Sequence, residues 1–244
     1  METGRGILEI AESGDAGLLH GQVRERALAS LYYFSKAILG YQLVSHLHLP
    51  FCNELQATIN DRKRGFLLPR GTYKSTIVSK SYPLWRYLSN QDIRVLIVGE
   101  SDTVAAKNLK DMKWNIENNQ LLRWSFPEAI PPDINKTVWN ESEMLLPRSR
   151  SFDENTIMTA GVGARITGHH FDLIIYDDLI GEKAAESEAE MKSAIEWFRY
   201  APGLLADPDK SEELIIGTRW KYGAADLYGW IMENLPFHVV EESA

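Results

Sequence analysis

The chain has 244 residues, of which 44% are hydrophobic and 25% charged, so it is long enough to bury a core and too apolar for wholesale disorder. No apolar run approaches the roughly 20 residues of a membrane span, and the acidic N-terminus is unlike a signal peptide, so no membrane partner is expected. The net charge of −8 excludes a protein that grips DNA over its whole surface, and the single cysteine, Cys52, excludes an internal disulfide and fits a reducing cytosolic setting.

The first part of the chain is helical in pattern. Over residues 16–60, apolar side chains such as Leu28, Leu31, Phe34 and Ile38 recur near helical spacing. We therefore expect a helical N-terminal segment over residues 1–60, packed on a core domain that covers residues 61–244.

The remaining chain alternates between expected strands and expected helices. Short runs rich in Val, Ile and Leu predict strands that are buried on both faces. The expected strands cover residues 65–68, 93–99, 143–147, 156–160, 172–177, 213–218 and 237–241, and the expected helices cover residues 74–88, 103–118, 183–200 and 224–234. This alternation predicts an α/β fold with a mainly parallel central sheet flanked by helices.

The stretch FLLPRGTYKST, residues 66–76, has the layout of a phosphate-binding loop. An apolar run ends in Pro69-Arg70-Gly71, and Lys74-Ser75-Thr76 then opens a helix. In such loops backbone N–H groups face the anion, the lysine reaches the outer phosphates and the hydroxyl holds Mg²⁺. Tyr73 and Leu68 stand where the usual pattern has glycine. The stretch is therefore either a divergent nucleotide loop or a mimic of one.

Two adjacent carboxylates, Asp177 and Asp178, follow the apolar run at residues 171–176. Ligands of open α/β sheets bind at the carboxyl ends of strands. Nucleoside triphosphate hydrolysis needs one carboxylate near Mg²⁺ and a second that orients the attacking water. Since adjacent strand residues point to opposite faces, both roles require a bend in the chain here. The alternative is that the pair only caps a helix that begins near Glu182.

Two further motifs are candidates for the chemistry. One ends an apolar run, and the other is a glycine-rich stretch that precedes an expected strand. Thr218 closes the run at residues 214–217 and is placed either to sense a terminal phosphate or only to shape a turn. Arg165 lies in the glycine-rich stretch at residues 161–168. An arginine on such a loop can stabilise charge on a transferred phosphoryl group, an effect on the order of 10³–10⁵ in rate, or it can form a surface salt bridge.

Taken in order, these stretches resemble the ATPase domain of the large terminase subunit, the DNA-packaging motor of tailed bacteriophages. The resemblance runs roughly over residues 50–234, and the motifs that carry it are LLPRGTYKST, VLIVGESDTVAAKNLKDM, WNESEMLLP, GVGARITGHHFDLIIYDD and IIGTRWKYGAADLYGWI. The resemblance implies a P-loop NTPase fold of the ASCE type. Residues around 49–51 would lie where this family contacts adenine.

The resemblance also implies roles for individual residues. Lys74 would be the phosphate-loop lysine, and Ser75 and Asp177 would hold Mg²⁺. Asp178 would be the catalytic acid, at a position where the family most often has glutamate. Glu182 lies close downstream and is a second candidate for that role. Arg165 would be an arginine finger that acts in a neighbouring subunit. The residues implied in nucleotide binding are Arg70, Gly71, Thr72, Tyr73, Lys74, Ser75, Thr76 and Thr218.

The implied protein is an ATP hydrolase that uses ATP and Mg²⁺ to drive double-stranded DNA into a procapsid in the host cytoplasm. Its implied partners are the portal protein and the small terminase subunit, and it would form a pentameric ring when assembled or a monomer when isolated. The nuclease domain of the family is not expected in this chain, so no nuclease activity is expected. Two alternatives are another P-loop DNA-dependent ATPase of helicase-like type and an ATPase-inactive assembly scaffold, which Tyr73 would favour.

Overall fold

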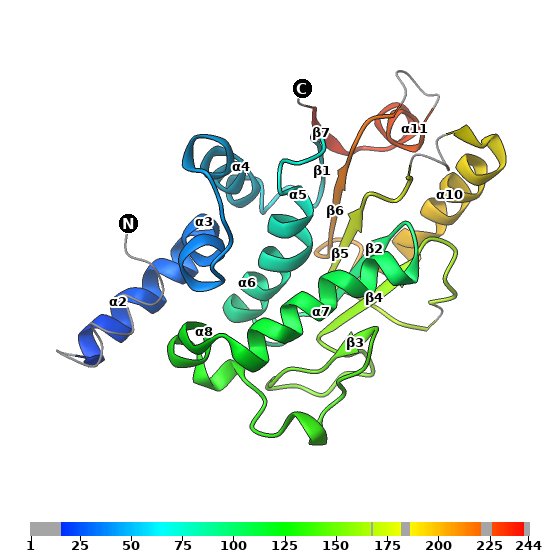
Figure 1. The fold of residues 1–244 in the computed structure, drawn as a ribbon. Helices are drawn as coiled ribbons and strands as arrows, with labels where there is room; N and C mark the ends of the chain where they lie inside the picture. The colour runs from blue at the N-terminus through cyan, green and yellow to red at the C-terminus, as the bar shows by residue number, and fades with distance from the viewer. Residues whose placement is uncertain (1–15, 167, 182–185, 221–225, 242–244) are drawn as a thin grey trace.

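A seven-stranded sheet forms the centre of the molecule in the computed structural model, which describes residues 16–166, 168–181, 186–220 and 226–241 (Figure 1). The strand order is β3-β4-β2-β5-β6-β1-β7. Neighbouring strands are parallel throughout, except for the antiparallel pair β3 and β4. The strands are β1 (Lys63–Leu67), β2 (Val95–Gly99), β3 (Glu143–Met144), β4 (Ile157–Gly161), β5 (Leu173–Asp177), β6 (Glu212–Gly217) and β7 (His238–Glu241).

The structure confirms the predicted α/β fold, and every expected strand is present. Boundaries differ from the expectation by one or two residues, and β3 is shorter than expected because only Glu143 and Met144 pair with β4 at the edge of the sheet. Every residue of β2, β4, β5 and β6 is buried, since helices cover both faces of the sheet.

Most of the helices lie on one face of the sheet. These are α2 (Ala16–Ala29), α3 (Leu31–Tyr33) with the π-helical segment Phe34–Ile38, α4 (Ser45–Ala57), α7 (Asp102–Asn118) and α8 (Gln120–Ser125). The same face carries a continuous helical segment made of α5 (Lys74–Thr76), the π-helical segment Ile77–Ser81 and α6 (Tyr82–Ser89). The opposite face carries α10 (Glu188–Tyr200) and α11 (Leu227–Asn234). The starts of the two helices expected from residues 183 and 224 lie outside the described residues.

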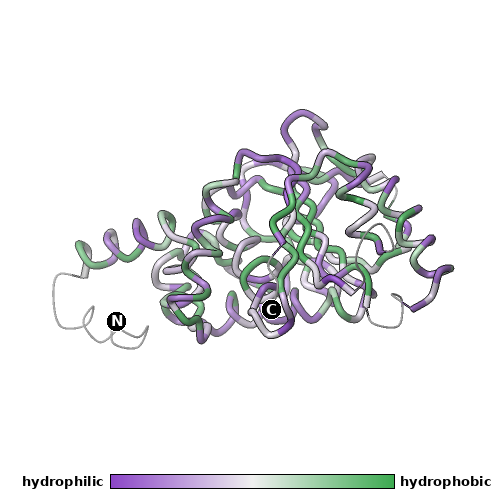
Figure 2. Tube along the Cα trace, turned by 90° about the horizontal axis from the view of Figure 1, so that it is seen from above, coloured by the Kyte–Doolittle hydropathy of each residue, from purple (hydrophilic) through white to green (hydrophobic). Residues whose placement is uncertain are grey.

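Two hydrophobic cores form because successive strand residues point to opposite faces. In β5, Leu173 and Ile175 belong to the core under the N-terminal helices, whereas Ile174 and Tyr176 belong to the core under α10 and α11. Figure 2 shows the strands as mainly hydrophobic segments inside the fold. Val23 of α2 shares the first core, so the expected N-terminal helices do pack on the sheet. The division of the chain at residue 60 stays a prediction.

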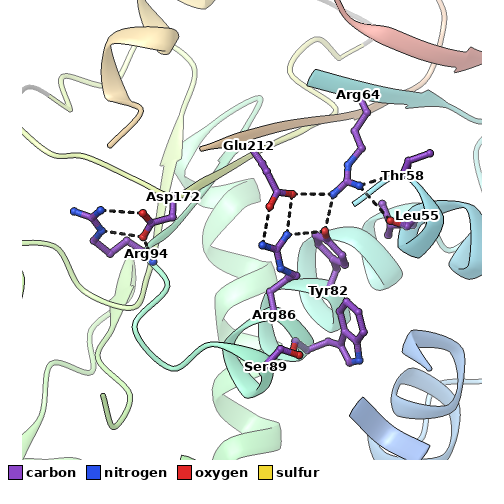
Figure 3. Close-up of polar contacts among 10 residues, drawn as sticks. Leu55, Thr58, Arg64, Tyr82, Arg86, Ser89, Arg94, Asp172 and Glu212 are labelled. Carbon is purple, nitrogen blue, oxygen red and sulfur yellow. Dashed lines mark hydrogen bonds and ion pairs between the residues drawn. The ribbon is translucent and has the colours of Figure 1, made fainter. Parts of the chain in front are cut away.

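A buried charged cluster ties β1 and β6 to α6 (Figure 3). Glu212 accepts hydrogen bonds from Arg86 at 2.7 and 2.8 Å and from Arg64 at 3.0 Å. The hydroxyl of Tyr82 accepts from Arg64 at 2.6 Å and from Arg86 at 2.9 Å. Two guanidinium groups therefore share one carboxylate inside the first core.

Among the described residues, no helix has both the length and the apolar character that crossing a bilayer would require.

Candidate functional site at the carboxyl ends of three strands

Several of the predicted site residues converge at the carboxyl ends of neighbouring strands. Since β6 lies between β1 and β5, the segments that follow these three strands meet at their carboxyl ends. The ammonium group of Lys74, after β1, donates to Thr218 Oγ1 at 2.9 Å and lies 3.0 Å from Asp178 Oδ2. Lys74 is only 6% exposed. These two contacts therefore hold a buried cation between the ends of β5 and β6.

Asp177 lies in a second contact, on the helical side of the same edge. The Ser75 hydroxyl donates to Asp177 Oδ1 at 2.8 Å, and the Asn108 amide of α7 donates to Asp177 Oδ2 at 3.0 Å. Sequence reasoning missed Asn108. The available signal was an amide on the apolar face of the helix, in line with the buried Ala105 and Met112.

The chain does bend between the two aspartates, as the two roles require. Asp178 adopts φ 45°, in the left-handed region, and its amide donates to the Ile216 carbonyl at 2.9 Å. This turn sends Asp177 toward Ser75 and Asp178 toward Lys74. A non-glycine residue in this conformation is strained by about 1–3 kcal/mol, and such strain tends to cluster at functional sites.

Burial raises the pKa of Asp177 above its usual value. Hydrogen bonds from Ser75 and Asn108 lower this pKa and the charge of Asp178 raises it, but burial is the largest cause and sets the direction. The site therefore contains a carboxylate whose charged form opposes folding.

We expect Asp177→Asn to stabilise the fold at neutral pH. With its folded pKa raised, Asp177 contributes stability that is present below the unfolded pKa of about 3.9 and is lost as pH rises through the folded pKa. Asparagine keeps both contacts, because its oxygen accepts from Asn108 while its amide donates to the Ser75 hydroxyl. Urea denaturation from pH 4 to 8 should show a variant advantage that grows with pH. A constant difference would contradict this prediction.

The loop between β1 and α5 takes the left-handed backbone geometry at two positions. Gly71 has φ 83°, and Tyr73 has φ 57° and ψ 18°. Tyr73 therefore occupies a conformation in which glycine would be unstrained. The ring of Tyr73 is 44% exposed and packs edge-on against His48, with centroids 5.4 Å apart.

The other loop residues are placed as follows. The Thr72 hydroxyl donates to the Pro69 carbonyl at 2.8 Å, which closes the turn internally. The Arg70 guanidinium stacks 4.3 Å above the ring of Trp220, which follows Thr218 and β6. Thr76 lies in the first turn of the helix, where its carbonyl accepts from Ser81. The loop is thus tied to β6 as well as to β1.

The structure does not bring Arg165 to the other site residues. Arg165 is exposed in the loop after β4 and forms no hydrogen bond or ion pair within the described part of the chain. Four strand spacings separate β4 from β1, which is roughly 19 Å at about 4.8 Å per spacing. The second acid candidate, Glu182, lies outside the described residues.

A cavity of about 330 Å³ opens beside the loop. Its lining combines apolar and polar side chains that include His48, Phe51, Phe66, Leu68 and Thr72. This volume is at the lower end of the range of small-molecule sites, roughly 300–1,000 Å³.

No protein-family model matches this chain, and no curated protein matches it either. The functional assignment therefore depends on the fold and on the geometry at the edge of the sheet.

Proposed function

We propose that this chain is an ATP hydrolase of the P-loop class. The observation that carries the proposal is that side-chain oxygens of Asp178 and Thr218 lie within 3.0 Å of the Lys74 ammonium group. The three residues follow three different strands. A phosphate oxygen that takes this ammonium displaces the Asp178 carboxylate. Asp178 is then free to orient the attacking water, and Thr218 is placed to detect the terminal phosphate.

The donor set beside Lys74 fits Mg²⁺. Ser75 Oγ and Asp177 Oδ1 are hard oxygen ligands 2.8 Å apart, and Mg²⁺ is commonly held by one or two protein groups together with substrate phosphates and water. When bound there, Mg²⁺ would neutralise charge on the phosphate oxygens. Asn108 holds the other Asp177 oxygen and so orients the carboxylate toward Ser75.

The cavity beside the loop is a suitable place for the nucleotide base. Thr72 and Leu68 line it directly after β1, and Phe51 and Phe66 supply aromatic surface, with ring centroids 5.4 Å apart. Phe51 belongs to α4, in the segment where the terminase resemblance implies adenine contacts. ATP would then extend from this cavity across the loop to Lys74.

Within the P-loop class, we propose the motor of a large terminase subunit, acting on double-stranded DNA with a portal protein and a small terminase subunit in the host cytoplasm. The motifs at residues 161–178 and 215–231 favour this over a helicase-like ATPase. The position of Arg165 supports a ring, because an exposed cation distant from its own Lys74 is available to a neighbouring subunit. Tyr73 remains the one feature that favours an inactive scaffold.

Release of inorganic phosphate from MgATP tests the proposal. The purified chain is assayed alone and again with portal protein and double-stranded DNA, because a trans-acting finger would be out of reach in a monomer. Turnover that depends on Mg²⁺ is the expected result. Absence of turnover under every oligomeric condition would favour the alternative function, an ATPase-inactive assembly scaffold.

For Arg165, we expect complementation between subunits. Arg165→Ala alone should lower turnover of the assembled protein by about 10³-fold or more, the effect of an arginine finger. Mixing Arg165→Ala with Lys74→Ala subunits should restore part of the activity, since some interfaces then combine an intact Lys74 with an intact Arg165. If the mixture stays inactive although both variants fold and associate, Arg165 does not act in trans.

A further inference from the structure

Tyr228 is a buried tyrosine whose hydroxyl proton has no acceptor among the described residues. The residue lies on α11 and is 1% exposed. The Leu179 amide lies nearby, but an N–H group can only donate, so it leaves the phenolic proton unsatisfied. Buried donors without acceptors are rare in folded proteins, and each one calls for an explanation.

The Tyr228 hydroxyl lies close to Gly217, the last residue of β6, beside the candidate site. A Cβ atom on Gly217 would lie only 2.5 Å from the Tyr228 hydroxyl oxygen, so glycine is required at this position. The preceding residue, Ile216, accepts the Asp178 amide. Because neighbouring strands lie about 4.8 Å apart, the phenol reaches the sheet next to Asp178, on the face opposite the helix that carries Lys74.

The helix that carries Tyr228 is anchored to the same strand end. Asp226 caps α11 by accepting from the Gly229 amide at 2.7 Å, and it also accepts from Arg219 Nε at 3.2 Å. Arg219 directly follows Thr218. The tyrosine is therefore held in place at the site by a buried carboxylate.

The Asp178 carboxylate is the acceptor that this geometry offers. After burial, the largest influence on the Tyr228 phenol is the negative charge of Asp178, which raises its pKa further, followed by that of Asp177. The Asp178 side chain is 37% exposed, so it has room to rotate. In the present structure its ion pair with Lys74 holds the carboxylate in place.

We propose that Tyr228 is a positioning residue for Asp178: when a phosphate oxygen takes Lys74, the freed Asp178 carboxylate accepts a hydrogen bond from the Tyr228 hydroxyl. This inference rests on the proposed ATPase function. The new hydrogen bond replaces the lost ion pair and fixes the carboxylate for the attacking water. The hydrogen bond would also make the contact between α11 and the site depend on whether a phosphate is bound there.

Tyr228→Phe tests the inference with Tyr87→Phe as the matched control. Tyr87 is equally buried, lies away from the site and donates to the Pro147 carbonyl at 2.7 Å. We expect Tyr228→Phe to lower kcat by about 10- to 100-fold, as for loss of a hydrogen bond to a charged group, without changing KM for ATP or lowering Tm. Tyr87→Phe should instead lower Tm by about 2–4 °C and leave kcat unchanged.

A binding measurement separates the inference from the proposed function. Adding Mg²⁺ and the non-hydrolysable analogue AMP-PNP should red-shift a tyrosine absorption band in the wild type and not in Tyr228→Phe. If the wild type hydrolyses ATP while Tyr228→Phe keeps its kcat, the inference is overturned and the proposed function stands. If AMP-PNP binds without the spectral change, the inference is also overturned. A wild type that neither binds nor hydrolyses the nucleotide overturns both.

Discussion

Lys74→Ala is expected to reduce ATP hydrolysis by about 10²–10³-fold, the effect of removing one preorganised group that stabilises developing charge. Lys74 is the buried cation that faces both Asp178 and Thr218. Phosphate release from MgATP is the measurement. Since Asp178 is partly exposed and can turn to water, the variant should still fold, which circular dichroism can verify.

Lys80→Ala is the matched control for Lys74. It lies in the same helical segment, but its ammonium group forms an ion pair with Asp111 at 3.5 Å, away from the site. We expect this variant to hydrolyse ATP at the wild-type rate. Asp177→Ala should behave like Lys74→Ala, because it removes a proposed Mg²⁺ ligand. Full activity in Lys74→Ala would eliminate the proposed phosphate-binding loop, whatever the effect of Asp177→Ala.

Glu212→Gln is expected to lower the free energy of unfolding by about 3–5 kcal/mol, the typical effect of removing one partner from a buried ion pair. Glu212 is the shared carboxylate of Arg64 and Arg86, whose side chains are 1% and 16% exposed (Figure 3). A neutral amide keeps the shape but leaves two buried guanidinium groups without a counter-charge. Urea denaturation of both proteins measures the difference.

Glu196→Gln provides the comparison on the surface. Its ion pair with Lys192 joins two exposed side chains of α10 at 3.9 Å. Such pairs contribute about 0–1 kcal/mol, so this variant should unfold close to the wild type. A loss below 1 kcal/mol for Glu212→Gln would show that water or local rearrangement compensates the two arginines.

The sequence was sufficient to predict the strands and most of the helices, although α8 was not among the expected elements. Strands such as β2 and β5 could be found because a strand covered on both faces is mainly apolar, as the run Leu173–Asp177 shows up to its last residue. The edge strand β3 was the least accurate, since its two residues pair with one neighbour only. The left-handed position of Tyr73 could be anticipated from the place of glycine in related loops.

Side-chain partners required the tertiary structure. Asn108 lies 69 residues from its acceptor Asp177, and no local pattern records that α7 brings this amide to the last residue of β5. Glu212 lay just outside the expected strand at residues 213–218, and its burial in β6 depends on two arginines from β1 and α6. These contacts depend on how the elements pack, which the period of a sequence pattern does not specify.

By itself, the sequence determined which residues are candidates for the chemistry: a lysine and a serine after β1, two carboxylates after β5 and a threonine after β6. Only the tertiary structure decided which of them meet. Strand order placed β6 between β1 and β5, which brings Lys74 to Asp178 and Thr218, and the same order leaves Arg165 four strands away. The physical reason is that hydrophobic periodicity specifies which face of a strand is buried, whereas strand order follows from long-range packing between elements far apart in the chain.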